Sequence, residues 1–382
     1  MFDLRRFTGR EMTISEKLLE FNWGFLLLLT VISSIGFAML YSVADGSFSP
    51  WALKQMTRFA AGAVMMVVVA LIDLRLWMRV AYPMYAVALV LVTAVDLVGF
   101  KGMGAQRWLD LGFIQLQPSE VMKVAILLAL ARYFHGLALD EVSRLRNLIV
   151  PVLLVVVPVG LVVEQPDLGT AILLTISGGT IFFAAGLAWR YFIITGLAVL
   201  GAIPIIWERL HDYQRDRVFT FLDPERDPLG AGYHILQSKI ALGSGGLFGK
   251  GFMQGSQAHL NFLPEKQTDF IFTMLGEELG FIGGITLLAF YCVALMFSIN
   301  VSLQCRNQFG RLLSLGVSVS FFFYVFINTA MVMGLLPVVG VPLPLVSYGG
   351  TAMLSLMFAF GLLMSCYIHR NLEIGRGSSS FF

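Results

Sequence analysis

The sequence carries little charge and little cysteine. Only 13% of its 382 residues are charged, against about 25% in a typical soluble domain, while 57% are hydrophobic. Apolar runs long enough to cross about 30 Å of hydrocarbon recur along the chain, so the shortage of charge excludes an ordinary soluble fold. The formal net charge of +2 says nothing about partners, and we expect no nucleic-acid partner.

The three cysteines, Cys292, Cys305 and Cys366, lie in or beside apolar runs and have no regular spacing. They therefore indicate neither disulfides nor a metal site. The chain also lacks an internal repeat and a separate polar block, and no convincing cleavage site follows its first apolar run. We expect residues 1–382 to form a single transmembrane domain with a retained first helix.

The expected fold class is an all-α polytopic membrane protein with about ten transmembrane helices. The expected helices are residues 22–43, 58–74, 80–99, 119–137, 148–163, 169–187, 191–208, 270–303, 312–334 and 348–368. Residues 209–269, between the seventh and eighth helices, should form a large structured extracytoplasmic loop. The Pro-rich residues 335–347 should form a re-entrant segment, because prolines there forbid a regular helix at membrane depth.

Basic residues predict the orientation of the helices. Most arginines and lysines fall in segments that face one side, whereas the short loops on the other side hold only Lys54, Arg58, Lys101 and Arg107. Because cytoplasmic loops carry the excess of basic residues, both termini should lie in the cytoplasm. The longest polar segments then face outward, and function should face outward with them.

The first candidate for chemistry is Asp269, where the long loop meets a helix. If that helix starts near Thr268, then Asp269, Thr273 and Glu277 share one face, with Asp269 at the water boundary and Glu277 about 12 Å deeper. Asp269 either stabilises the helix start electrostatically or carries chemistry, and spacing alone leaves both readings open. We expect Glu277 and Glu278 to be an intramembrane structural pair.

A second group lies around the start of the fourth helix. Pro118 suits the first helical position, which places Glu120 in the first turn and lets Lys123 pair with it three residues later. Arg107 and Trp108 precede them on a segment expected at the membrane interface. This pattern indicates either an interfacial anchor with a buried ion pair or a cationic site for a phosphorylated lipid head group, since arginine matches phosphate oxygens.

Asp167 precedes the sixth helix. It either caps that helix, or lines a cavity and shares with Asp269 in binding a divalent cation. Carboxylate oxygens suit Mg²⁺ or Mn²⁺, so such a cation stays an open alternative although no cofactor is required by the motifs.

The long loop is expected to fold above the membrane, because loops of this length in a compact protein usually serve a function. Its basic residues include Arg215, Arg217 and Lys239. Its Gly-rich part does not fit a phosphate-binding P-loop, since Ser244 stands where a glycine is needed and Gly251 stands where Ser or Thr should follow Lys250. The loop histidines, His211, His234 and His259, lack metal-ligand spacing.

These segments together resemble the SEDS family (shape, elongation, division and sporulation proteins) over essentially the whole chain. Residues 328–352 match the family signature throughout. The Arg-Trp…Gln-Pro-Ser-Glu, Gln-Pro-Asp-Leu-Gly-Thr and Leu-Pro-Glu-x-x-Thr-Asp-Phe elements follow in the family's order. The short tails and the version Phe-Leu-Pro-Glu-Lys-Gln-Thr-Asp-Phe look more like the elongation branch (RodA type) than the division branch (FtsW type).

The resemblance implies a peptidoglycan glycosyltransferase of the bacterial cytoplasmic (inner) membrane, with its active site facing the periplasm. Such an enzyme polymerises lipid II into β-1,4-linked glycan strands held on undecaprenyl pyrophosphate. The implied partners are a class B penicillin-binding protein, a transpeptidase, and the rest of the elongation machinery.

Matching to the family motifs makes Asp269 the essential acidic residue, and we expect it to act as the general base. The expected substrate-binding residues are Arg107, Trp108, Glu120, Lys123, Asp167, Arg215, Arg217, Lys239 and Ser347. Many family members have a histidine where this chain has Gln267, so a mechanism that needs an imidazole there is in doubt.

Two other classes of function stay open at this point. A protein with intramembrane charges could carry lipid II across the bilayer as a flippase, although the polar groups gather near the outer face and no inverted repeat is visible. Alternatively, the chain could be a scaffold for a synthase, in which case Asp269 would be replaceable.

Overall fold

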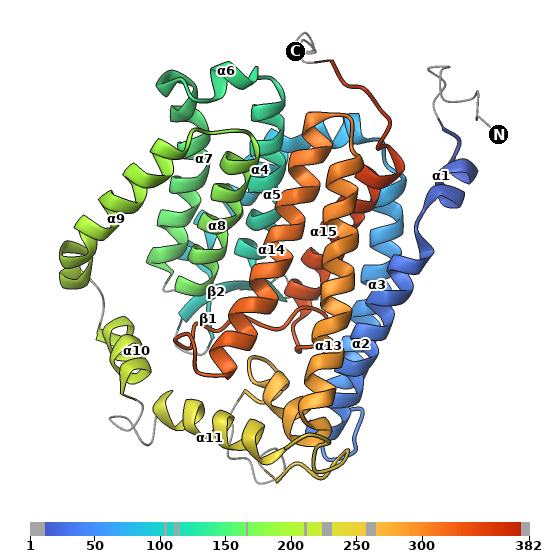
Figure 1. Ribbon diagram of the computed structural model, residues 1–382, viewed down its shortest axis with the longest axis vertical. Helices are drawn as coiled ribbons and strands as arrows, with labels where there is room; N and C mark the ends of the chain where they lie inside the picture. Colours follow the sequence, from blue (N-terminus) through green and yellow to red (C-terminus); the bar gives the residue numbers. More distant parts are fainter. Residues whose placement is uncertain are drawn as a thin grey trace.

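The computed structural model is a bundle of long helices with one small sheet packed at its side (Figure 1). It describes residues 12–102, 105–110, 112, 115–165, 167–209, 212–223, 231–256 and 265–375. The helices are α1 (Ile14–Glu20), α2 (Trp23–Val43), α3 (Ala52–Leu71), α4 (Leu74–Val98), α5 (Pro118–His135), α6 (Leu139–Val142), α7 (Leu145–Glu164), α8 (Leu168–Ala184), α9 (Trp189–Arg209), α10 (Asp212–Leu222), α11 (Ala231–Ser244), α13 (Ile271–Gln304), α14 (Gln308–Val332) and α15 (Gly350–Ile368).

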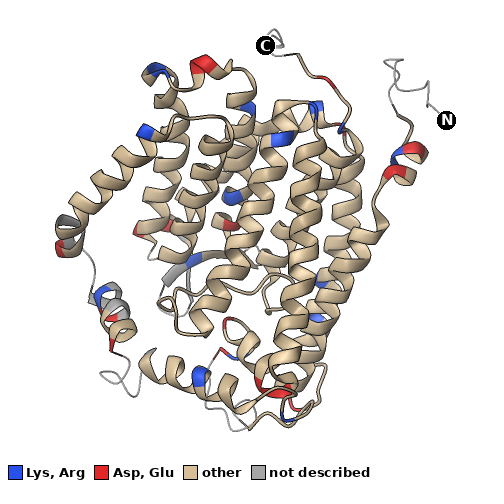
Figure 2. Cartoon of the chain, in the orientation of Figure 1, with Lys and Arg blue, Asp and Glu red and all other residues tan. Residues whose placement is uncertain are grey.

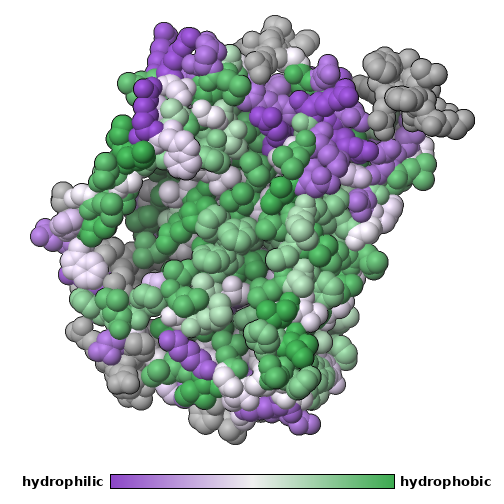
Figure 3. All heavy atoms as spheres, viewed as in Figure 1, coloured by the Kyte–Doolittle hydropathy of each residue, from purple (hydrophilic) through white to green (hydrophobic). Residues whose placement is uncertain are grey.

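Helices are present at all ten expected positions, as α2 to α5, α7 to α9 and α13 to α15. Within the described ranges, seven helices are long and apolar enough to cross a membrane: α2, α3, α4, α7, α13, α14 and α15. Hydrophobic residues cover the middle of the face in Figure 3, and Figure 2 shows most charged residues toward the two ends of the bundle. The expected fold class, an all-α polytopic membrane protein, is therefore confirmed.

The two ends of the bundle differ in what they hold. The upper end (Figure 1) holds α1 and the segment after α15, as an even number of crossings requires. The lower end is where α2 finishes and where α11 lies.

Several expected boundaries were wrong: α3 begins at Ala52, so Lys54 and Arg58 lie in its first turns and not in a loop.

Helix α5 is the central helix of the bundle. Its sequence is apolar around most of its circumference, and nearly every side chain from Pro118 to His135 is buried. It packs against α4, α7, α8, α14 and α15. Glu120 and Lys123 are thus placed inside the bundle and away from lipid.

Helices α3 and α15 pack most closely, because glycines remove side chains from their contact. A Cβ atom at Gly361 would lie 2.7 Å from Cβ of Val69, and one at Gly62 would lie 2.9 Å from Cγ of Met357. Small residues of this kind let membrane helices approach one another. The contact fixes α15, whose first residues border the candidate site.

A small antiparallel sheet lies where the sequence suggested only an interfacial segment. Its strands are β1 (Phe100–Gly102), β2 (Ala105–Asp110) and β3 (Gln115–Leu116), in the order β1-β2-β3. Trp108 pairs with Phe100, and Leu109 pairs with Leu116. Because β2 contacts α4 and α5, the sheet holds Arg107 and Trp108 beside the start of α5.

Helix α13 is bent near its start. Gly280 has φ 68° and ψ −166°, which breaks the helix into a short first section, residues 271–279, and a long second section. Only glycine adopts such a conformation readily, so the bend depends on the residue type at this position. The second section crosses the bundle from the lower to the upper end (Figure 1).

Residues 333–349, between α14 and α15, are irregular, and residues 341–347 are mostly buried. Polar side chains satisfy their backbone: Asn328 Nδ2 donates to the Val341 carbonyl at 2.7 Å, and the Tyr291 hydroxyl donates to the Pro344 carbonyl. A Cβ at Gly36 would lie 2.6 Å from Cα of Val346, so α2 also packs against this segment. Irregular backbone inside the bundle is stable only with such partners.

Candidate active site

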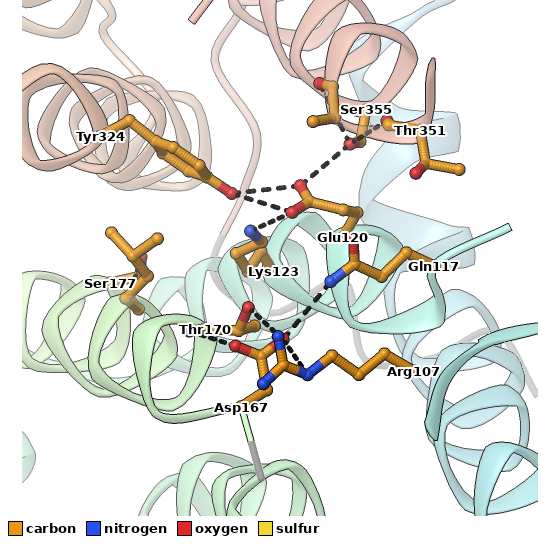
Figure 4. Close-up of polar contacts among 12 residues, drawn as sticks. Arg107, Gln117, Glu120, Lys123, Asp167, Thr170, Ser177, Tyr324, Thr351 and Ser355 are labelled. Carbon is orange, nitrogen blue, oxygen red and sulfur yellow. Dashed lines mark hydrogen bonds and ion pairs between the residues drawn. The ribbon is translucent and has the colours of Figure 1, made fainter. Parts of the chain in front are cut away.

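Glu120 is the centre of a buried polar group (Figure 4). Its Oε1 accepts a hydrogen bond from Lys123 Nζ at 2.6 Å. The Tyr324 hydroxyl donates to both carboxylate oxygens, at 3.3 and 3.1 Å, and Ser355 Oγ donates to Oε2 at 3.3 Å. Lys123 Nζ also lies 4.4 Å from the centre of the Tyr324 ring. The carboxylate is thus held by α5, α14 and α15 together.

Asp167 forms a second polar group beside the first. It caps α8, accepting from the Thr170 backbone nitrogen at 3.2 Å and from Thr170 Oγ1 at 2.9 Å. Gln117 Nε2 donates to its Oδ2 at 3.4 Å, and Arg107 Nε lies 3.8 Å from the same oxygen (Figure 4). Because Gln117 immediately precedes α5, it links Asp167 to the helix that carries Glu120.

Asp269 lies in a turn, residues 265–270, immediately before α13. Its carbonyl accepts a hydrogen bond from Asn328 Nδ2 at 2.9 Å. Ser347 Oγ donates to the Thr268 carbonyl at 2.5 Å, and the Tyr348 backbone nitrogen donates to the Gln267 carbonyl at 2.9 Å. The turn that carries Asp269 is therefore fixed by α14 and by the irregular segment before α15.

The expected helical face for Asp269 was wrong. Helix α13 begins at Ile271, so Asp269 precedes it, and Thr268 Oγ1 bonds to Glu265 Oε2 at 2.9 Å and does not cap the helix. Glu277 was expected deeper in the membrane, but it and Glu278 bond to the segment 245–256 at the lower end of the bundle. The two carboxylates have separate partners and do not form a pair. Glu277 was placed too deep because the bend at Gly280 was not expected.

The Asp269 side chain and the first residues of α8 both approach the same short segment of backbone. A Cβ at Gly340, where φ is +74°, would lie 3.5 Å from Asp269 Oδ2. A Cβ at Gly169 would lie 2.7 Å from the neighbouring Val339 carbonyl. The Thr-Asp-Phe and Gln-Pro-Asp-Leu-Gly-Thr motifs, distant in sequence, thus meet at residues 339–340.

A cavity opens between α5, α14, α15 and the irregular segment. Polar side chains gather at one part of its wall, among them Gln55, Glu120, Lys123 and Ser347. Apolar side chains form the rest, including Leu127, Phe321, Leu356 and Ala359. Such a space can take a ligand that combines a polar group with a hydrocarbon chain.

Sequence reasoning missed Arg58, which it placed in a loop. Its guanidinium lies 4.8 Å from the centre of the Tyr348 ring, and a Cβ at Gly350 would lie 3.0 Å from its Cζ. Its Nη1 is buried and has no hydrogen-bond partner among the residues that the structure describes. One turn earlier, Gln55 Nε2 donates to the Ser347 carbonyl at 2.8 Å. The sequence did contain a sign of Arg58 and Gln55, because a basic and a polar residue stand beside an apolar run there.

The remaining predicted residues lie farther from this group or outside it. Arg215 donates to the carbonyls of Trp207 and Glu208, at 3.0 and 2.8 Å, and so caps the end of α9. Lys239 is exposed on α11 and lies against Gly334. The side chain of Arg217 lies outside the described part of the chain.

Of the loop histidines, only His234 lies in the described part of the chain, on α11, whereas positions 211 and 259 lie outside it. Across the described ranges, no group of three or more His, Cys, Asp or Glu side chains is placed to hold a metal ion. The turn before α13 also holds Lys266, where burial lowers the pKa of the ammonium group and nearby Asp45 acts in the opposite direction.

Known proteins are similar to this chain over most of its length. The sequence profile of the FtsW/RodA/SpoVE family, described as cell cycle protein, matches residues 17–372. The peptidoglycan glycosyltransferase MrdB of Escherichia coli K12 is 48% identical over 320 residues, which cover 84% of this chain and 86% of that protein. A probable peptidoglycan glycosyltransferase FtsW of Trichlorobacter lovleyi is 36% identical over 363 residues, covering 91% and 93%.

Two solved structures are similar over nearly the whole chain. A chain from a study of how a peptidoglycan synthase complex coordinates polymerization and crosslinking has a TM-score of 0.80 and 31% identity, covering 92% of this chain and 98% of that one. The rod shape determining protein RodA of Thermus thermophilus has a TM-score of 0.70 and 28% identity, with coverage of 92% and 98%.

Proposed function

We propose a catalytic arrangement for this chain on the premise that it belongs to the FtsW/RodA/SpoVE family. The chain is a peptidoglycan glycosyltransferase of the elongation type, as its 48% identity to MrdB against 36% to an FtsW relative indicates. The arrangement rests on one observation. The Asp269 turn, the irregular segment before α15 and the buried polar group of α5 lie together.

Asp269 acts as the general base. It takes the proton from the 4-hydroxyl of the acceptor N-acetylglucosamine, and that oxygen attacks the anomeric carbon of the lipid-linked donor strand. The bond from this carbon to the pyrophosphate oxygen breaks, the carbon inverts to the β configuration, and undecaprenyl pyrophosphate leaves. General base catalysis of this kind contributes about 10²–10⁴-fold in rate. Asn328 and Ser347 support the role, because they hold the backbone around Asp269.

The leaving pyrophosphate requires positive charge that is not already neutralised. Lys123 is paired with Glu120 at 2.6 Å, and Arg107 lies 3.8 Å from Asp167. Arg58 has a buried N–H group without a partner among the described residues, and it lies beside the Tyr348 ring near the Asp269 turn. Arg58 is therefore the residue best placed to stabilise charge on the pyrophosphate, with Lys123 and Arg107 as further cations.

The substrate is lipid II together with the growing strand on undecaprenyl pyrophosphate. The cavity next to Glu120 supports this choice, since its wall combines polar side chains with a larger apolar surface. Trp108 and Asp167 border the approach to α5. Lys239 belongs at most to an outer part of the binding surface.

The enzyme works in the bacterial inner membrane with its active site toward the periplasm and a class B penicillin-binding protein as its partner. The lower end of the bundle, with the candidate site beside it, is then the periplasmic end. The similarity to a chain studied for coordinated polymerization and crosslinking supports a crosslinking partner. The excess of basic residues toward the other end supports the orientation.

The test of Asp269 is polymerisation of labelled lipid II by the purified protein with its cognate penicillin-binding protein, whose transpeptidase is blocked by a β-lactam. Wild type should make glycan strands and Asp269→Asn, which keeps the size of the side chain, should make none while it still binds the partner. Strands at a normal rate from the folded Asp269→Asn complex would rule out the proposed base. Failure of wild type to make strands, with lipid II crossing vesicles that contain it, would favour a flippase.

A further inference from the structure

The Gly-rich part of the long loop packs directly on the bend of α13. The backbone nitrogens of Lys250 and Gly251 donate to the carbonyls of Glu277 and Glu278, both at 3.0 Å. Beyond the bend, two backbone nitrogens of α13 donate back to the carbonyls of residues 246 and 247, at 2.9 and 3.1 Å. The loop therefore satisfies backbone groups that the bend removes from the helix.

This contact excludes side chains on the loop. A Cβ at Gly245 would lie 2.0 Å from the Gly276 carbonyl oxygen, and one at Gly249 would lie 2.1 Å from the Glu278 carbonyl oxygen. At Gly280 a Cβ would lie 2.3 Å from the Gly249 nitrogen. The glycines that looked like a failed P-loop thus serve close packing of one backbone on another.

Two fully buried carboxylates complete the contact. Glu277 accepts from Lys250 Nζ at 2.6 Å and from Ser256 Oγ at 3.0 Å. Glu278 accepts from Ser42 Oγ, in the last turn of α2, and from the Met253 backbone nitrogen at 3.1 Å. A buried carboxylate is stable only with partners of this kind, so the ion pair and the loop depend on each other.

The first section of α13 connects this contact to Asp269. Residues 271–279 form a short helix that follows the Asp269 turn, and Glu277 lies about 9 Å along it from Ile271 at 1.5 Å per residue. The section is also held near its start, where Ser238 Oγ lies 2.8 Å from Thr273 Oγ1. Asp269 belongs to the turn at one end of the section, and the Lys250–Glu277 ion pair holds the other end.

We propose that Lys250 and Glu277 are positioning residues for Asp269. The ion pair keeps the first section of α13 at a fixed tilt, and that tilt sets where the Asp269 carboxylate meets the acceptor hydroxyl. Neither residue touches substrate. The inference rests on the proposed role of Asp269 as general base, and it adds that the Gly-rich loop controls the rate of the chemical step.

The experiment measures kcat and apparent KM for lipid II in the complex with the β-lactam-blocked partner. Lys250→Met alone removes the counter-charge of the buried Glu277 carboxylate, so it tests folding as much as position. The double variant Lys250→Met/Glu277→Gln removes both charges and leaves no unpaired buried ion, so it should fold. Both should lower kcat by at least about tenfold with KM nearly unchanged, because displacement of a reacting group by about 1 Å costs up to about 10²-fold.

Three comparisons complete the design. Lys250→Arg keeps the pair and should retain most of the rate. Arg144→Met breaks an exposed ion pair with Asp140, whose charged atoms are 3.1 Å apart, and should leave kcat unchanged. Asp269→Asn, measured in parallel, tests the general base by itself.

The outcomes separate the two proposals. A wild-type kcat in the folded double variant, with only a lower melting temperature, overturns the positioning role while an inactive Asp269→Asn leaves the general base standing. An active Asp269→Asn overturns both. A fall in kcat without a change in KM, restored in Lys250→Arg, is the result that supports the inference.

Discussion

At the scale of single residues, the polar interior depends on pairs that neutralise each other. Lys123 is nearly fully buried, and its ammonium is compensated by Glu120 and by the face of the Tyr324 ring. Removal of one member of a buried ion pair is costly because the remaining charge has lost its partner. Removal of a single hydrogen bond to the pair costs less, because both charges stay together.

Glu120→Gln is therefore expected to destabilise the protein by about 3–5 kcal/mol, because it leaves Lys123 buried without a counter-charge. Tyr324→Phe should cost about 1.5–3 kcal/mol, since it removes the hydroxyl hydrogen bond but keeps the ring over Lys123. Thermal unfolding of the purified variants in detergent would order them. Equal melting temperatures for the two variants would show that the ammonium is solvated in the cavity.

Part of this group was predictable from the sequence. The pairing of Glu120 with Lys123 followed from their spacing of three residues on one helix, and the cap of α8 by Asp167 followed from its residue type and position. The contacts of Glu120 with Tyr324 and Ser355 were not predictable, because more than two hundred residues separate them in the chain. No periodicity within one element carries that information.

At the scale of elements, the two sections of α13 have different tasks. The long section crosses the bundle, whereas the short section joins the Gly-rich loop to the turn that carries Asp269. A straight helix was the natural expectation from the apolar run, because a single glycine inside a helical pattern is usually tolerated. The bend arises from the tertiary contact with residues 245–251, and it moved Glu277 and Glu278 to the lower end of the bundle.

Two neighbouring glycines of that loop provide a matched test of the contact. Both Gly246 and Gly249 have positive φ, 55° and 81°, but a Cβ at Gly246 meets nothing within 4 Å, whereas one at Gly249 meets the Glu278 carbonyl oxygen at 2.1 Å. Gly246→Ala should cost about 1–2 kcal/mol of stability for the left-handed backbone alone. Gly249→Ala should cost about 1–3 kcal/mol of stability beyond that amount, because the opposing backbone is displaced, and it should also lower the polymerisation rate. Similar melting temperatures and polymerisation rates for the two variants would show that the loop moves away from α13 at no cost.

At the scale of the whole molecule, the arrangement of helices followed from composition and the arrangement of the site did not. Hydrophobic runs predicted ten helices, and all ten are present. The small sheet was missed because its strands are short and their partners are set by the loop geometry. Helix α9 corresponds to the seventh expected membrane helix, residues 191–208. In the structure α9 is exposed along most of its length and is joined to the bundle mainly at its start, where the Tyr191 hydroxyl donates to the Ser143 carbonyl at 2.8 Å.

The proposed orientation predicts which end of the bundle is reached from outside the cell. In a background without the three native cysteines, Phe248→Cys places a thiol at a position that is 79% exposed at the lower end. Arg144→Cys places one just before α7, at the upper end of the bundle, where the native side chain is 60% exposed. A membrane-impermeant maleimide should label position 248 in intact spheroplasts and position 144 only after lysis. The reverse pattern would invert the orientation.

The internal pairing of charges in the site has a consequence for turnover. Glu120 with Lys123 and Asp167 with Arg107 form two nearly electroneutral couples, so the interior exerts little net attraction on an anion. Arg58, whose buried Nη1 has no hydrogen-bond partner among the described residues, and Lys266 in the Asp269 turn are the further cations close to the reacting groups. A polymerase that adds one disaccharide unit after another must release an anionic pyrophosphate carrier in every cycle. Weak net attraction lets the spent carrier depart, so its release need not limit the speed of strand growth.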